Sequence, residues 1–112
     1  MNFYDAVNNM IRAFKDMEEY KQYIELKKVI KADEKYGKML VDFKEKQKTH
    51  QMEFMTTGKL EEAHEKELEN LYSLLIQNEN VRKFLELEMK LDVYLADMQK
   101  NIGDGIKEML EF

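Results

Sequence analysis

Two amphipathic helical stretches joined by a glycine-containing turn constrain this sequence more than any other feature. Between residues 33 and 77, apolar side chains recur at helical spacing on both sides of the turn at residues 55–59, whose sequence is MTTGK. At 100° per residue each set falls on one stripe, which a helix buries against a neighbour. Gly58 is the expected helix stop, because glycine readily takes the left-handed conformation of a C-terminal cap. The stripes comprise Tyr36, Met39, Leu40, Phe43 and Phe54 before the turn, and Leu60, Ala63, Leu68, Leu71, Leu74 and Leu75 after it.

The segments on either side of this stretch also have helical patterns. The chain lacks proline and has four glycines among 112 residues, which favours long helices with short connections over a sheet. We therefore predict an all-α fold in a single helical domain spanning residues 1–112. Residues 1–32 are expected to form two short helices, residues 33–77 a long antiparallel helical hairpin, and residues 78–112 a C-terminal helix.

Three polar positions have the form of helix starts. Asp16, with Glu19 three residues later, has the pattern of a capping box that restarts the chain as a second helix. Asp33 is the expected N-cap of the first hairpin helix, and either Asn78 or Asn80 can cap the last helix. These caps define where each predicted helix begins.

The last helix has an unusually wide apolar arc. Its apolar side chains cover roughly 180° of the circumference, against roughly 100° for an ordinary surface helix. A helix buried on half its surface needs two neighbours: the first helix, and either the base of the hairpin or a second protomer. We therefore expect a homodimeric bundle. The arc comprises Phe84, Leu85, Leu87, Leu91, Tyr94, Leu95, Met98 and Ile102, after which Gly103 and Gly105 weaken the helix.

Charge and composition restrict the functional classes. The net charge of −5 disfavours direct nucleic-acid binding, and no apolar segment is long enough to span a membrane. The absence of cysteine and of a signal-peptide pattern leads us to expect a cytoplasmic protein. The two hairpin arms carry opposite charges that favour their pairing, with Lys35, Lys38, Lys44, Lys46 and Lys48 on the first and Glu61, Glu62, Glu65, Glu67 and Glu69 on the second.

Polar residues near the hairpin turn are the strongest site candidates. Gln47 and His50 fall within the stripe of the first arm and His64 near the centre of the second, so antiparallel pairing can bring the two imidazoles within about one helical turn. Glu61-x-x-His64 has the spacing used in di-iron bundles. That ligand set is far smaller than such sites require, so we prefer a polar layer that fixes register and expect neither metal nor cofactor.

Other polar and methionine positions support structural or binding roles. Glu88 lies on the apolar face of the last helix, where we expect it to find hydrogen-bond donors and serve the structure. Met52, Phe54 and Met55 lie near the turn, where they either pack or form a surface that docks a partner protein. Ser73 and the threonines Thr49, Thr56 and Thr57 show no adjacent base, so we assign no catalytic residue and expect no enzyme.

Several segments together resemble the YlbF/YmcA family of small helical bacterial proteins, nearest its YheA-like branch. Members of that family act in a cytoplasmic complex that promotes competence, biofilm formation and sporulation, and that modulates messenger RNA processing by an endoribonuclease. Cysteines associated with iron–sulfur binding in the family have no counterpart here. The resemblance rests on Asn2-Phe3-Tyr4-Asp5-Ala6, on Asp33, on Phe43-x-x-x-Gln47 before Gly58, and on Asn78-x-x-Val81-x-x-Phe84-x-x-x-Glu88-x-x-Leu91.

The preferred functional hypothesis is a non-enzymatic helical protein-interaction module, homodimeric and able to bind a heterologous regulatory protein. Two alternatives stay open at this point. One is an accessory factor in messenger RNA processing, which the family resemblance implies. The other is a metal-binding helical bundle that uses His50 and His64.

Overall fold

The computed structural model describes residues 2–112, which form helices and no β-strand. The all-α prediction is therefore confirmed. The chain divides into two compact units, each described by itself: a hairpin unit, Leu26–Phe84, and a terminal unit, made of the chain through Glu25 together with Leu85–Phe112. The helices are α1 (Phe3–Lys15), α2 (Glu18–Ala32), α3 (Glu34–Thr57), α4 (Glu62–Leu75), α5 (Glu79–Gly105) and α6 (Lys107–Leu110).

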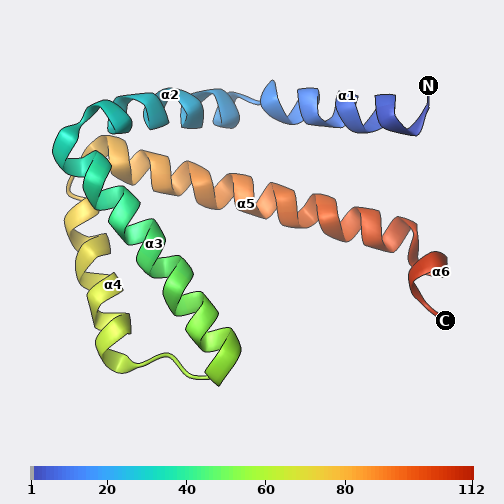
Figure 1. Ribbon diagram of the computed structural model, residues 1–112. Coiled ribbons are helices and arrows are strands. Elements are labelled where there is room, and N and C mark those ends of the chain that lie inside the picture. Colours follow the sequence, from blue (N-terminus) through green and yellow to red (C-terminus); the bar gives the residue numbers. More distant parts are fainter. Residues whose placement is uncertain (1) are drawn as a thin grey trace. The chain divides into compact units, whose positions relative to one another are not determined.

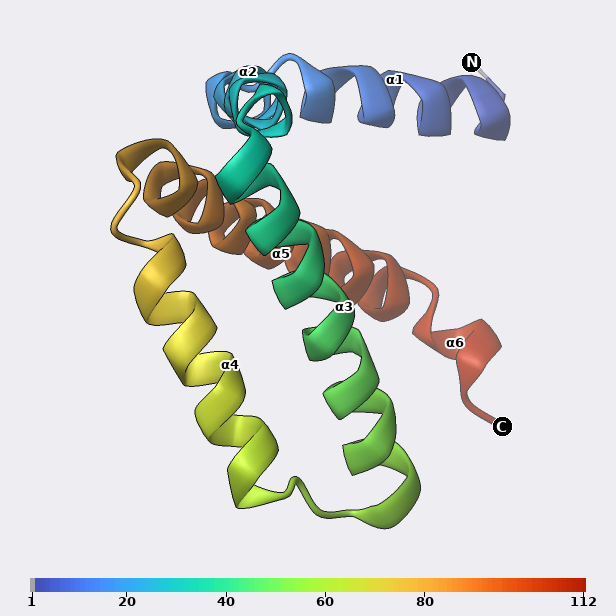
Figure 2. The ribbon, with the colours of Figure 1, turned by 60° about the vertical axis from the view of Figure 1, so that its left-hand side comes forward.

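The hairpin unit contains the predicted pair of long helices, α3 and α4, which lie side by side (Figures 1 and 2). Asp33 is the N-cap of α3: its backbone is extended, and its carboxylate accepts a hydrogen bond of 2.9 Å from the Tyr36 amide. Gly58 ends α3 with φ 75°, and its amide donates to the Phe54 carbonyl oxygen at 2.7 Å. Both predicted ends of α3 are confirmed.

The core of the hairpin unit lies near the base of the hairpin, away from the turn. Phe43 on α3 packs close to Tyr72 on α4, with ring centroids 6.1 Å apart. Phe54, predicted on the buried stripe, is 55% exposed. The reason is that α4 begins only at Glu62, so the last turn of α3 has no helix opposite it. The buried apolar side chains of this unit are Ile30, Leu40, Phe43, Leu75, Val81 and Phe84.

A short corner joins α4 to α5. Asn78 accepts a hydrogen bond of 3.1 Å from the Val81 amide through its side chain, as predicted for the cap of the last helix. The amides of Ile76 and Gln77 donate to carbonyl oxygens of the last turn of α4. Leu75 and Val81, on either side of the corner, are fully buried. The corner is therefore fixed both by hydrogen bonds and by packing.

The terminal unit contains α1, the first part of α2 and most of α5, with α1 and α5 running in opposite directions (Figure 1). Asn2 caps α1 by accepting a hydrogen bond from the Asp5 amide. The capping box predicted at Asp16 and Glu19 is wrong. Asp16 has the right-handed helical conformation, φ −82° and ψ −9°, and is the C-cap of α1, whereas an N-cap residue needs an extended backbone.

Burial along α5 ends before the helix does. Leu85, Leu87 and Leu91 are buried, but the apolar side chains of the second half of the arc, such as Leu95 and Ile102, are exposed. The helix continues through Gly103 and ends at Gly105, beyond which α6 adds a single turn. None of the helices in residues 2–112 is both long and apolar enough to cross a membrane.

Candidate functional site

The two histidines of the chain stack on one another between the hairpin arms. Their ring centroids are 4.6 Å apart and their planes are within 7° of parallel. His50, on α3, is 6% exposed, and His64, on α4, is half-buried. The antiparallel arrangement of α3 and α4 around Gly58 therefore brings both imidazoles into one layer.

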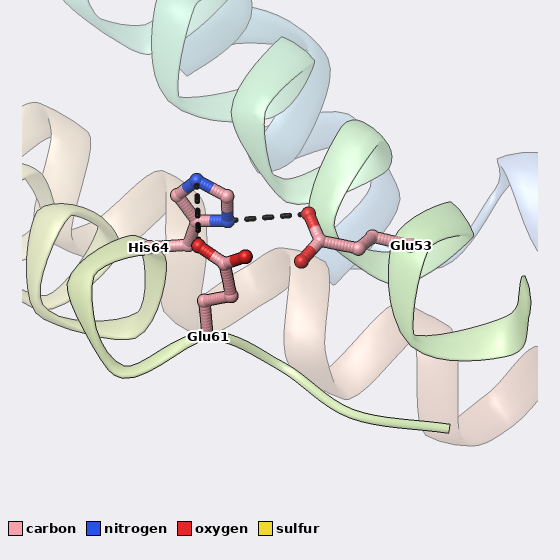
Figure 3. Close-up of side chains that lie close together, drawn as sticks. All are labelled: Glu53, Glu61 and His64. Atoms are coloured by element: carbon pink, nitrogen blue, oxygen red, sulfur yellow. Dashed lines mark ion pairs between the residues drawn. The ribbon is translucent and has the colours of Figure 1, made fainter. Parts of the chain in front are cut away.

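His64 lies between two glutamates that come from opposite sides of the turn. Its Nδ1 is 3.1 Å from Glu53 Oε2, and its Nε2 is 3.8 Å from Glu61 Oε2 (Figure 3). Glu53 is near the end of α3, and Glu61 immediately precedes α4 without capping it through its side chain. We call Glu53, Glu61 and His64 the tip cluster.

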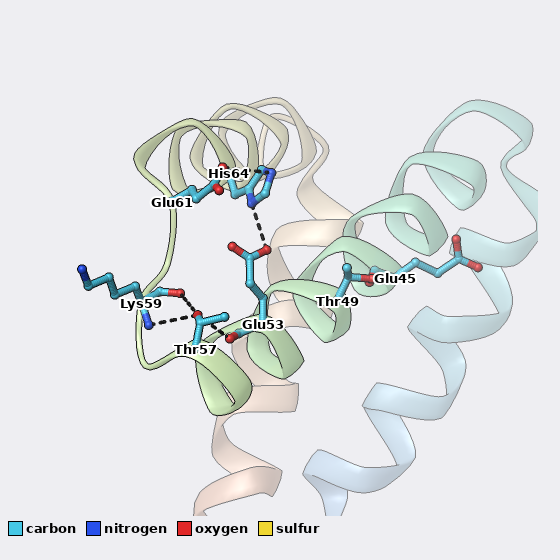
Figure 4. Close-up of polar contacts among 7 residues, drawn as sticks. All are labelled: Glu45, Thr49, Glu53, Thr57, Lys59, Glu61 and His64. Carbon is cyan, nitrogen blue, oxygen red and sulfur yellow. Dashed lines mark hydrogen bonds and ion pairs between the residues drawn. The ribbon is translucent and has the colours of Figure 1, made fainter.

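Threonine hydroxyls near the turn bond to the main chain. Thr57 Oγ1 lies 2.8 Å from the Glu53 carbonyl oxygen, 3.0 Å from that of Lys59, and accepts from the Lys59 amide at 3.3 Å (Figure 4). Thr49 Oγ1 donates to the Glu45 carbonyl oxygen at 3.0 Å. These contacts fix the end of α3 and the turn, and they give the hydroxyls a structural role.

An ion pair joins the two arms on the side of the histidines that is farther from the turn. Lys46 Nζ on α3 lies 2.6 Å from Glu67 Oε1 on α4 and 3.2 Å from Asp42. The hydrogen bond to Glu67 is the main cause of the raised pKa of Lys46, and the same bond lowers the pKa of Glu67. Both side chains are partly exposed, so the pair favours the correct register more than it adds to stability.

The other predicted site residues lie elsewhere. Gln47, predicted within the polar layer, is exposed. Met52 and Met55 are exposed, as is Phe54, so these side chains have little packing within the hairpin unit. Glu88 belongs to the terminal unit, where its carboxylate accepts a hydrogen bond of 3.2 Å from the Tyr23 hydroxyl.

Because Tyr23 is partly buried beside Glu88, its hydroxyl should lose its proton at a higher pH than an ordinary tyrosine. Burial raises the pKa of Tyr23 from 10.0 to about 12, and the nearby charge of Glu88 adds to the effect. Because the folded-state pKa is the higher one, the contact stabilises the fold fully below pH 10 and is lost as the pH rises toward 12. An alkaline titration followed by phenolate absorbance should lose its last-ionising component in Tyr23→Phe. Tyr4→Phe, at an exposed position, should retain it; loss in both variants would contradict the assignment.

A second candidate site is an apolar groove within the terminal unit. It has a volume of about 590 Å³ and lies between α1 and the C-terminal part of α5. Met10 and Phe14 line it from α1, and Met98 and Ile102 from α5. Its lining is mostly apolar, with Asp97 and Asn101 as the polar exceptions beside Tyr94.

Sequence reasoning missed Glu53 and Tyr23. Glu53 is three residues after His50, so it lies on the same side of α3, and that spacing was a usable signal. Tyr23 is 65 residues from Glu88, and no local pattern relates two such distant positions. Glu61 was considered together with His64, and the structure places both in the tip cluster.

Comparison with known families identifies the chain. The family described as "Control of competence regulator ComK, YlbF/YmcA" matches residues 3–107. The chain belongs to this family. The match covers all of α1–α5, so both units are part of the family's common sequence.

Individual relatives also match along nearly their whole length. A UPF0342 protein of Desulfitobacterium hafniense is 34% identical over 110 residues, covering 98% of this chain and 89% of that protein. A UPF0342 protein of Symbiobacterium thermophilum is 32% identical and one of Clostridium tetani 30% identical, each covered over 97% of its own length. These matches thus extend over nearly all of this chain and most of each relative.

Proposed function

We propose that this member of the YlbF/YmcA family is a cytoplasmic, non-enzymatic protein-interaction module that pairs with a second copy of itself through the terminal unit. The observation that carries the proposal is that α1 has no buried residue, although it is a regular helix of 13 residues. A helix of that length is marginal in water and normally depends on packing of its apolar face. An additional covering surface would supply that packing.

The exposed apolar side chains support a copy of the chain as that surface. Phe3, Met10 and Ile11 are exposed on α1, and Leu95 and Ile102 on α5. In a two-fold dimer the same surface of each copy packs against its equivalent on the other copy. One interface therefore covers the exposed apolar side chains of both copies. The wide apolar arc along α5 fits the same arrangement.

The family supports a regulatory role for the module. Its description refers to control of a competence regulator, which is a function exerted on another protein. Within the described residues the threonine hydroxyls serve the main chain, which fits binding better than catalysis. The exposed side chains of Met52, Phe54 and Met55 stay our prediction for the surface that meets a heterologous partner.

Sedimentation or light scattering of the purified chain tests the dimer. We expect twice the chain mass of 13.5 kDa for the unaltered protein. Met10→Glu and Ile102→Glu place a charge in the groove, so each should yield a species of 13.5 kDa. The matched control is Val41→Glu, at an exposed position of α3, which should remain dimeric.

A monomer at every concentration would overturn the proposal if hydrogen exchange showed α1 to be protected in that monomer. An equal effect of Val41→Glu would also contradict it, since the dimer would then not depend on the terminal unit. Circular dichroism of each variant separates loss of pairing from loss of helix.

A further inference from the structure

We propose that the tip cluster binds a divalent transition-metal ion of the zinc class, which joins the two arms of the hairpin across the turn. Glu53, Glu61 and His64 each offer one ligand atom, and these atoms lie within 4.8 Å of one another (Figure 3). Glu53 precedes Gly58, whereas Glu61 and His64 follow it. A shared ion would therefore add a second link between α3 and α4, next to the stacked rings of His50 and His64.

The distances suit a common ion. Zinc binds imidazole nitrogen and carboxylate oxygen at about 2.0–2.2 Å, so two ligands in tetrahedral geometry lie roughly 3.4 Å apart. His64 Nδ1 and Glu53 Oε2, at 3.1 Å, already have nearly that separation. Glu61 approaches the other ring nitrogen, Nε2, at 3.8 Å, so its exposed side chain would have to turn toward Nδ1 to share the ion.

The orientation of Glu53 relative to His64 also suits a shared cation. Its oxygen is within reach of His64 Nδ1, yet that buried nitrogen makes no aligned hydrogen bond. An oxygen that accepts a hydrogen bond lies near the axis of the ring nitrogen. An oxygen that shares a metal ion with the nitrogen lies off that axis, because the ion occupies it. The lack of an aligned hydrogen bond at His64 Nδ1 fits the second arrangement.

His50 lies beside the cluster and supports the ring of His64, although it is not one of the three ligand residues. Its ring is more than nine-tenths buried and stacks on His64, and its Nδ1 has no hydrogen-bond partner among residues 2–112. Buried polar atoms are nearly always satisfied, so this nitrogen marks the histidine layer as a place that favours a further polar partner. The stack also holds the His64 ring in place, which lowers the reorganisation that ion binding requires.

The donor set selects the class of metal. One imidazole and two carboxylates, without thiolate, suit zinc and neighbouring divalent ions, and the affinity order places zinc above manganese and iron. Three protein ligands leave a coordination position for water. The two carboxylates also supply negative charge that complements a divalent cation.

Calorimetric titration of the chelator-treated full chain with zinc ions tests the proposal. We expect one ion per chain, a raised melting temperature and a shift of the His64 ring-nitrogen resonances. Glu53→Gln and His64→Gln should each weaken zinc binding by about tenfold or more. Glu65→Gln, which alters an exposed carboxylate next to His64, is the matched control and should leave affinity unchanged.

Two results would overturn the proposal. One is an unchanged melting temperature and unchanged His64 resonances in a saturating excess of zinc. The other is binding that persists at full affinity in both Glu53→Gln and His64→Gln, which would place the ion elsewhere on the chain. Circular dichroism confirms that each variant is folded. Sedimentation with and without zinc shows whether zinc binding changes the oligomeric state, so that the metal proposal and the dimer proposal are tested separately.

Discussion

Replacement of Leu75 by alanine should lower the free energy of unfolding by about 2–5 kcal/mol, because it leaves a cavity at a fully buried position. Leu75 is the last residue of α4 and has 0% exposure. The surrounding corner is held by hydrogen bonds from Ile76 and Asn78, so it has little freedom to collapse into the space. Urea denaturation followed by circular dichroism measures the change.

The neighbouring leucine provides the control for this substitution. Leu74 precedes Leu75 in the same helix and is 49% exposed. Leu74→Ala removes the same atoms and keeps helix propensity, yet it should cost less than about 1 kcal/mol, as expected for a surface change. Similar losses in both variants would mean that the burial pattern around the corner is different from the one described.

Gly37→Ala should lower the free energy of unfolding by about 1–3 kcal/mol, although alanine is the better helix former. Gly37 lies in the first turns of α3, and a Cβ added there would be 2.9 Å from the Ile30 carbonyl oxygen. That oxygen belongs to the main chain at the end of α2, so it cannot move aside as a flexible side chain would. Relief requires a backbone shift at the junction that Asp33 caps.

Gly103 is the matched control, since it is also a glycine inside a helix. A Cβ at Gly103 meets no atom within 4 Å. Gly103→Ala should therefore raise the free energy of unfolding by about 0.5–1 kcal/mol through the reduced entropy of the unfolded chain. A stabilising effect at Gly37 would show that α2 and α3 approach less closely than the structure indicates.

The ends of the hairpin helices were predictable because their signals are local. Asp33 and Asn78 accept hydrogen bonds from amides three residues ahead, and Gly58 needs only its own left-handed conformation. Each of these helix ends therefore depends on only a few consecutive residues. The helical periodicity of apolar residues likewise predicted the buried positions Leu40 and Phe43.

Features that depend on where a second helix ends were not predictable. Phe54 has the correct spacing for the buried stripe, but it is exposed because α4 starts too late to cover it. Asp16 matches a capping box in sequence, yet its backbone has right-handed helical dihedral angles and it ends α1 instead of starting α2. For the tip cluster, the sequence showed Glu61 and His64, whereas the approach of Glu53 depends on the register between arms.

The two connections of the hairpin unit should differ in the insertions they tolerate. Residues 59–61 are a short non-helical link whose neighbours are largely exposed, so a peptide tag or an added cysteine for a single fluorescent label should be accepted there. Residues 76–78 lie between two fully buried side chains and carry the cap of α5. Extra residues at that connection would separate Leu75 from Val81, so the chain should accept a reporter at one end of α4 and reject it at the other.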